Sequence, residues 1–156
     1  MLQTIVSGAS IKPFMAKLFQ GTEFSGFEVR KIEIKTITKF SIDGQLETTE
    51  EEAPVQFCTW AQLQPYALNI IKGSVKPRAI KIIFALGQTE MQSHFAEHAN
   101  DASLFLNIAF DGDKITLTTG YSQKTFTLDK TINTAWDAYI TQFLAKNQIE
   151  QTEQPV

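Results

Sequence analysis

The sequence predicts an α+β fold in which one or two mostly antiparallel sheets pack against two or three helices. Three observations lead to this prediction. Segments of alternating apolar and β-branched residues make up much of the chain. Turn signals separate several of these segments, as expected for neighbouring antiparallel strands. Segments with apolar residues at helical spacing lie between and after the strands. The order of these elements predicts two halves of β-α-β-β-β type followed by a C-terminal helix.

The first half contains a short strand, a helix and a hairpin. Residues 2–6 (LQTIV) predict an opening strand, and apolar spacing predicts a helix over 11–20. The alternating segment 27–40 predicts a strand, and a shift in its apolar parity indicates a β-bulge. Asp43 and Gly44 predict the turn at which this strand folds back.

The middle of the chain repeats this order. Residues 55–57 predict a short strand that buries Cys58. Thr59 is suited to cap a helix that ends at Gly73, and residues 79–86 form an apolar run that predicts a buried strand.

The rest of the chain predicts a polar segment, a β-meander and a helix. Residues 87–101 are polar and predict one short helix. The meander is predicted to have turns at 111–113 and 120–122 and strands at 104–110, 115–119 and 125–128. The final helix starts near Thr131 or Asn133. We expect residues 1–149 to form a single domain and residues 150–156 to form a flexible tail.

Composition and charge narrow the functional classes. The chain has 156 residues, 43% of them hydrophobic and 20% charged, which is typical of one globular domain. A net charge of −3 argues against strong affinity for nucleic acids, although it allows a local basic patch. The single cysteine fits a reducing cytoplasm, and no apolar run approaches the ~20 residues that a membrane span needs. We expect no cofactor.

His94, Glu97 and His98 form the sharpest motif associated with catalysis. The string His94-Phe95-Ala96-Glu97-His98 has the H-x-x-E-H spacing of inverted zinc proteases, in which two histidines share one helical face. A third ligand would have to come from a remote acid such as Glu150 or Glu153. A solvated loop or helix is the alternative, and we favour it, so we assign no metal site.

Two groups of basic residues are candidates for contact with an anion or a partner. Lys72, Lys76 and Arg78 surround the turn after the predicted second helix, and Lys12 and Lys17 lie on the first. The alternative is a helix C-cap with solvated lysines, because no phosphate-binding glycine motif occurs.

The second half carries a family resemblance. The strings LFLNIAF, TLTTGYS, FTLDK and AWDAYITQFL, with IIKG and SIDG earlier in the chain, resemble a family of uncharacterised proteins, mostly from Firmicutes. This family is known only as a domain of unknown function, so the resemblance implies a fold without catalytic residues.

The element order is also similar to that of DNA sliding clamps, whose domains pair two β-α-β-β-β halves. That resemblance implies helices facing a polyanion at Lys12, Lys17 and Lys72, and rings formed by self-association. Fold alone does not fix function.

These observations favour a non-enzymatic binding or interaction domain with an unknown protein partner or with itself as partner. A clamp-like protein associated with nucleic acid is the second hypothesis, and a zinc-dependent hydrolase is the third. We expect a cytoplasmic protein with no membrane association.

Overall fold

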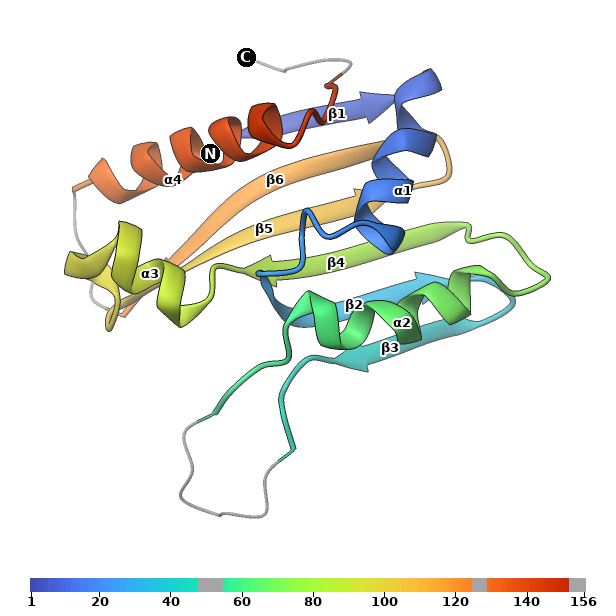
Figure 1. The fold of residues 1–156 in the computed structure, drawn as a ribbon, viewed down its shortest axis with the longest axis horizontal. Helices are drawn as coiled ribbons and strands as arrows, with labels where there is room; N and C mark the ends of the chain where they lie inside the picture. The colour runs from blue at the N-terminus through green and yellow to red at the C-terminus, as the bar shows by residue number, and fades with distance from the viewer. Residues whose placement is uncertain (48–54, 125–128, 152–156) are drawn as a thin grey trace.

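The computed structural model describes residues 1–47, 55–124 and 129–151, and it confirms the α+β class. Its strands form one antiparallel sheet in the order β1-β6-β5-β4-β2-β3 (Figure 1). The strands are β1 (Gln3–Ser7), β2 (Glu28–Lys35), β3 (Lys39–Asp43), β4 (Ala79–Ala85), β5 (Ala102–Phe110) and β6 (Lys114–Gln123). The helices are α1 (Ile11–Gln20), α2 (Trp60–Ile71), α3 (Gln88–His94) and α4 (Thr131–Lys146), with 3-10 turns η1 (Gly8–Ser10) and η2 (Ala96–His98).

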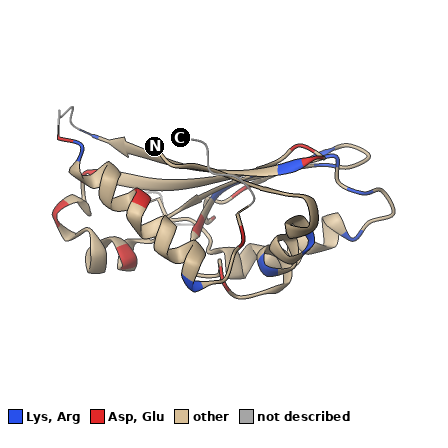
Figure 2. Cartoon of the chain, turned by 90° about the horizontal axis from the view of Figure 1, so that it is seen from above, with Lys and Arg blue, Asp and Glu red and all other residues tan. Residues whose placement is uncertain are grey.

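The helices cover one face of the sheet and leave the other face open (Figure 2). Alternation along β4 shows the two environments: Ile80, Ile82 and Phe84 are buried beneath the helices, whereas Lys81 points to the open face and is exposed. The hydrophobic core therefore lies in a single layer between sheet and helices. Among the described residues, no helix is long and apolar enough to span a bilayer.

Two tryptophans fix the helices to their neighbours. The buried Trp60 at the start of α2 donates its indole N–H to the carbonyl of Leu18 at 2.7 Å, and Trp136 of α4 donates to the carbonyl of Phe105 at 2.9 Å. Each ring is thus buried with its one polar atom satisfied. Thr59 caps α2 through a capping box with Gln62, as its position before the helix predicted.

The first hairpin turns earlier than the sequence predicted. Its turn lies at 36–38, where the N–H of Thr36 donates to the carbonyl of Thr38, and Ile37 is 79% exposed at its tip. The predicted bulge is confirmed between Val29 and Lys31. Gly44 follows the last residue of β3 and does not form a hairpin turn. Its backbone instead packs closely against the bulge of β2.

Two further expectations about strands were wrong. The expected turn at 120–122 lies inside β6, where Gly120 faces Phe105 across the ladder. The expected strand at 55–57 is reduced to an isolated bridge between Phe57 and Gln45, and Cys58 is half-buried instead of lying in the core. The short pairing leaves no ladder to bury it.

Two expected segments involve residues at the limits of the description. The predicted strand 125–128 lies outside the described residues, as does the end of the expected tail, 152–156. The tail's first residues have contacts: Ser10 donates to Glu150 at 3.4 Å, and Thr4 donates to Gln151 at 2.7 Å.

Candidate binding cleft

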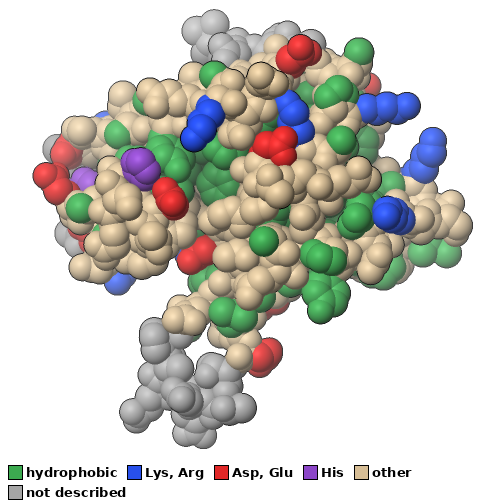
Figure 3. Space-filling view, in the orientation of Figure 1, with side chains coloured by type: hydrophobic (Ala, Val, Ile, Leu, Met, Phe, Trp, Pro, Cys, Tyr) green, Lys and Arg blue, Asp and Glu red, His purple; other side chains and the backbone are tan. Residues whose placement is uncertain are grey.

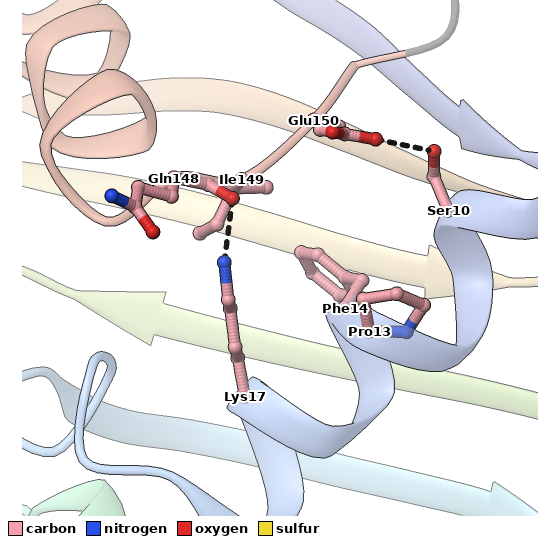
Figure 4. A pocket seen from close by; sticks show the side chains of 7 residues that line it. All are labelled: Ser10, Pro13, Phe14, Lys17, Gln148, Ile149 and Glu150. Atoms are coloured by element: carbon pink, nitrogen blue, oxygen red, sulfur yellow. Dashed lines mark hydrogen bonds between the residues drawn. The ribbon is translucent and has the colours of Figure 1, made fainter.

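The polar groups of the pocket beside α1 are engaged in contacts within the fold. Figure 4 shows Lys17 of α1, and Ser10 just before this helix, reaching toward the segment that follows α4. The ammonium of Lys17 donates to the carbonyls of Asn147, at 2.9 Å, and of Gln148. These carbonyls lie at the negative end of the α4 dipole, where a cation is stabilising. Lys17 therefore joins α1 to the segment that follows α4, and its ammonium is engaged in hydrogen bonds within the fold.

The other candidate basic residues lie apart from Lys17. Lys12 is exposed on α1, and Lys72, Lys76 and Arg78 are exposed between α2 and β4. Because the N–H of Arg78 donates to the carbonyl of Lys35 at 2.7 Å, this connection lies against the end of the first hairpin.

The two histidines do not share a helical face. Helix α3 ends at His94, because Phe95 leaves helical geometry (φ −138°, ψ 44°) and buries its ring near Trp136 and Tyr139. His98 then lies in η2, with its Nδ1 3.7 Å from Asp101, and His94 pairs with Glu90 at 3.4 Å. In the part of the chain that the structure describes, no three potential metal ligands come together.

The most distinctive hollow is an aromatic cleft of about 260 Å³ between α3, α4 and the connection from α1 to β2. Figure 3 shows hydrophobic side chains at the bottom of a hollow on the helical face. The residues that line this aromatic cleft are Glu23, Gly26, Phe27, Leu86, Glu90, Tyr139, Phe143, Lys146 and Asn147.

Stacked rings make the floor of the cleft rigid. The ring of Phe143 meets Phe27 edge-on with centroids 5.2 Å apart, and Phe27 stacks on Phe84 at 5.4 Å with an interplanar angle of 9°. Tyr139 stacks on Trp136 at 5.4 Å and meets His94 edge-on at 5.3 Å. Such contacts hold each ring in one orientation, so the floor is formed before any ligand arrives.

Charged side chains stand at the rim of the cleft. Glu23 comes from the connection before β2, Glu90 from α3 and Lys146 from the last turn of α4. Burial and the nearby Glu90 charge raise the pKa of Tyr139, so its phenol stays neutral near pH 7. The cleft combines an apolar floor with two acids and one base.

In the comparison with known families, residues 17–152 match a family of unknown function (DUF5721). The chain belongs to the DUF5721 family. The matched region includes every residue of the aromatic cleft. Neither the curated proteins nor the solved structures gave a match. Family membership confirms the resemblance to a domain of unknown function, and the likeness to sliding clamps is not confirmed.

The aromatic cleft of this DUF5721 member was missed by sequence reasoning. Alternation predicts a strand that begins at Phe27, and apolar spacing in the final helix predicts a stripe, including Tyr139 and Phe143, that packs on the sheet. One signal was available: the apolar stripe of α4 is wider than one buried face needs, and Tyr139 and Phe143 lie at its border and are only half-buried.

Proposed function

We propose that this DUF5721 member is a non-enzymatic binding domain whose aromatic cleft receives an apolar side chain from a partner protein. The observation that carries the proposal is the juxtaposition of a rigid aromatic floor with an acidic rim. The partner segment would place an aromatic or aliphatic side chain against Phe27 and Tyr139, and a neighbouring Lys or Arg near Glu23 and Glu90.

Size and chemistry support a side chain as the occupant. At about 260 Å³ the cleft lies just below the ~300–1,000 Å³ of typical small-molecule sites. Aromatic anchors in preformed pockets supply much of the affinity in protein interfaces. Two carboxylates beside aromatic faces favour a cation over an anion, both by charge and by cation–π attraction.

Peptide display on the intact protein tests this proposal. We expect selected peptides to share an aromatic or large aliphatic residue next to Lys or Arg. Tyr139→Ala should weaken their binding about tenfold, the loss typical of an aromatic anchor. Glu90→Lys should weaken it by reversing a rim charge.

Tyr66→Ala is the matched control, because Tyr66 is an exposed aromatic residue of α2 outside the cleft. It should leave the affinity unchanged. Selected peptides that bind Tyr139→Ala and Glu90→Lys as tightly as the wild type would contradict the proposal.

A second candidate function, contact with a polyanion, is favoured by the distribution of lysines and arginines. Several strands begin or end at the same side of the sheet, close to the connection from α2 to β4. Together these segments form a basic end, which Figure 2 shows as clustered blue segments. We define the basic end as Lys35, Lys39, Lys72, Lys76, Arg78, Lys81 and Lys114, all exposed. Asp111 and Asp113 lie in the neighbouring turn and reduce its charge.

Retention of double-stranded DNA on a filter at increasing salt concentration tests the second candidate. We expect weak, salt-sensitive binding that Lys76→Glu with Arg78→Glu abolishes, because phosphate contacts act through counterion release. Lys130→Glu changes an exposed lysine at the start of α4 and should have little effect. Absence of retention at low salt would rule out this candidate.

We also propose that this function belongs to the cytoplasm of a bacterium. The family resemblance supports the bacterial origin, and a half-buried, lone Cys58 suits a reducing compartment.

A further inference from the structure

The outer edge of β3 is an unpaired sheet edge. β3 is the last strand of the sheet and pairs with β2 alone among the described residues. An unpaired edge presents a row of N–H and C=O groups that can template another strand. The edge of β3 is therefore a candidate docking surface.

The direction of the ladder identifies which backbone groups of β3 face outward. The N–H of Gly44 donates to the carbonyl of Arg30 at 3.2 Å, which continues the pairing of β3 with β2. In an antiparallel ladder, alternate residues direct both backbone groups to the same neighbour. Phe40 and Ile42 therefore face β2 with theirs, and Lys39, Ser41 and Asp43 direct theirs away from the sheet.

The side chains of β3 are symmetric in charge about Ser41. A second copy of β3 placed antiparallel, with the two Ser41 residues opposite each other, would set Lys39 of each copy against Asp43 of the other. It would also set Phe40 against Ile42 on the helical side. Cross-strand pairs of opposite charge and of apolar residues each stabilise an antiparallel ladder.

An apolar surface runs beside this edge. Phe40 is 38% exposed and Tyr66 of α2 is 64% exposed. Beside Ile42 of β3 lies a hollow of about 420 Å³, lined by Ile42, Cys58, Gln62, Leu63 and Tyr66. Pairing of two β3 edges would bring two such surfaces together and bury apolar side chains along with the backbone groups.

The opposite edge of the sheet differs from that of β3. Beside β1, the segment after α4 is attached by the bond from Thr4 to Gln151 and the bond from Ser10 to Glu150. β1 also has no charged residues, so it offers no charge pairing in either orientation.

We propose that the protein forms a two-fold symmetric dimer through its β3 edges, with Ser41 at the axis and the two sheets joined into one. The interface is isologous, so each copy uses the same residues. The occupant of the β3 edge is a second copy of this chain, because the strand's charges are complementary to themselves under that symmetry.

Charge reversal of β3 tests the dimer by sedimentation equilibrium. The wild type should associate with micromolar affinity to about 35 kDa, twice the 17.5 kDa of one chain. The pair of positions 39 and 43 occurs on both sides of the two-fold axis. Lys39→Asp therefore sets two acids against each other in both pairs, and Asp43→Lys sets two bases against each other in both pairs. Each should weaken association at least about tenfold. The double variant restores opposite charges and should recover most of the wild-type affinity.

The backbone of Ser41 provides an independent test with a matched control. Ser41→Pro removes an N–H that points away from β2, so it should abolish the dimer and preserve the hairpin. Ser41→Ala keeps the N–H and should dimerise as the wild type does. Circular dichroism checks that the proline variant is folded, and if it is not, the charge-reversal series decides alone.

Three results would overturn the proposal. One is a wild type that stays monomeric at about 100 μM, a concentration well above the micromolar dissociation constant expected for the dimer. Another is a double variant no better associated than the single ones. The third is growth beyond the dimer into rings or filaments, which would indicate head-to-tail pairing of β3 with another edge.

Discussion

Gly44 and the β-bulge of β2 fit together at the level of single atoms. A Cβ atom built on Gly44 would stand 1.7 Å from the carbonyl oxygen of Val29. The N–H of Cys58 donates to the carbonyl of Gly44 at 2.7 Å, so a second backbone hydrogen bond holds the glycine in place. The strand can approach the bulge only because no side chain intervenes.

We predict that Gly44→Ala destabilises the protein by at least about 2 kcal/mol, because backbone atoms must move to admit the methyl group. Gly26→Ala is the control, since no atom lies within 4 Å of its Cβ position. It should change the free energy of unfolding by less than about 1 kcal/mol. Urea unfolding of both variants measures this, and equal effects would contradict the role assigned to Gly44.

The same bulge directs Arg30 to the open face of the sheet. Its guanidinium lies 3.9 Å from the ring centroid of Phe57 and 5.5 Å from that of Phe105, and it pairs with Glu28 at 3.6 Å. Burial raises the pKa of Glu28, and this effect exceeds the opposing influence of the Arg30 charge and of the N–H of Gln88.

This shift predicts that Glu28→Gln stabilises the protein at pH 7. A carboxyl group whose pKa is raised by folding resists ionisation in the folded state, so its charge costs stability above that pKa. The cost disappears as the pH falls below the ordinary value of 4.5. We expect a gain of less than about 1 kcal/mol at pH 7, vanishing near pH 4.

Glu33→Gln is the control of opposite sign. A hydrogen bond from Lys31, together with the charges of Lys39, Lys31 and Lys81, lowers the pKa of Glu33. Its ionised form therefore stabilises the folded state above the ordinary pKa, and this contribution is lost as the pH falls through the folded value. The variant should lose thermal stability at pH 7 and match the wild type in acid. Shifts of the same sign in both variants would contradict this account.

At the scale of elements, α1 is joined to the end of α4 through Lys17. Lys12, the other lysine of α1, does not share this role. It is exposed, and no contact of its ammonium is seen within the described ranges. Two lysines of one helix thus have different environments, although their sequence context is similar.

Lys17→Met should cost about 1–2 kcal/mol of stability, the usual range for a charged hydrogen bond at a helix C-terminus. Lys12→Met should change it by no more than about 0.5 kcal/mol, as exposed substitutions usually do. Thermal unfolding of the two variants makes the comparison. If both lose the same amount, the contact of Lys17 with the end of α4 contributes nothing specific.

Sequence patterns predicted whole elements better than the contacts between them. Helix α1 matched its predicted bounds, because its apolar positions and Gly21 are local signals. The hairpin turn was wrong because Asp43 and Gly44 also suit a strand end, and only the packing of Gly44 on Val29 distinguishes the two. The aromatic cleft depends on Phe27 and Phe143 meeting, and no local pattern encodes a contact so distant along the chain.

At the scale of the whole molecule, the layers separate three surfaces. The helical face holds the aromatic cleft, the strand ends hold the basic end, and the outer edge of β3 lies beside the exposed Tyr66 (Figures 1 and 2). Because the sheet is a single antiparallel layer with helices on one side, its open face and the outer edge of β3 stay available for partners. A dimer through β3 would leave both aromatic clefts on the helical side of the joined sheet.

This arrangement predicts that stability depends on protein concentration. In a dimer that is more stable than its subunits, unfolding is linked to dissociation, so each tenfold rise in concentration adds about 1.4 kcal/mol per mole of dimer. The thermal midpoint of the wild type should therefore rise with concentration, whereas that of Ser41→Pro should stay constant. Tyr139→Ala should shift the midpoint of both proteins equally at every concentration, because the aromatic cleft lies away from β3. A wild-type midpoint independent of concentration, in a sample shown to be dimeric, would mean that each subunit unfolds without leaving its partner and that the β3 ladder is not what joins them.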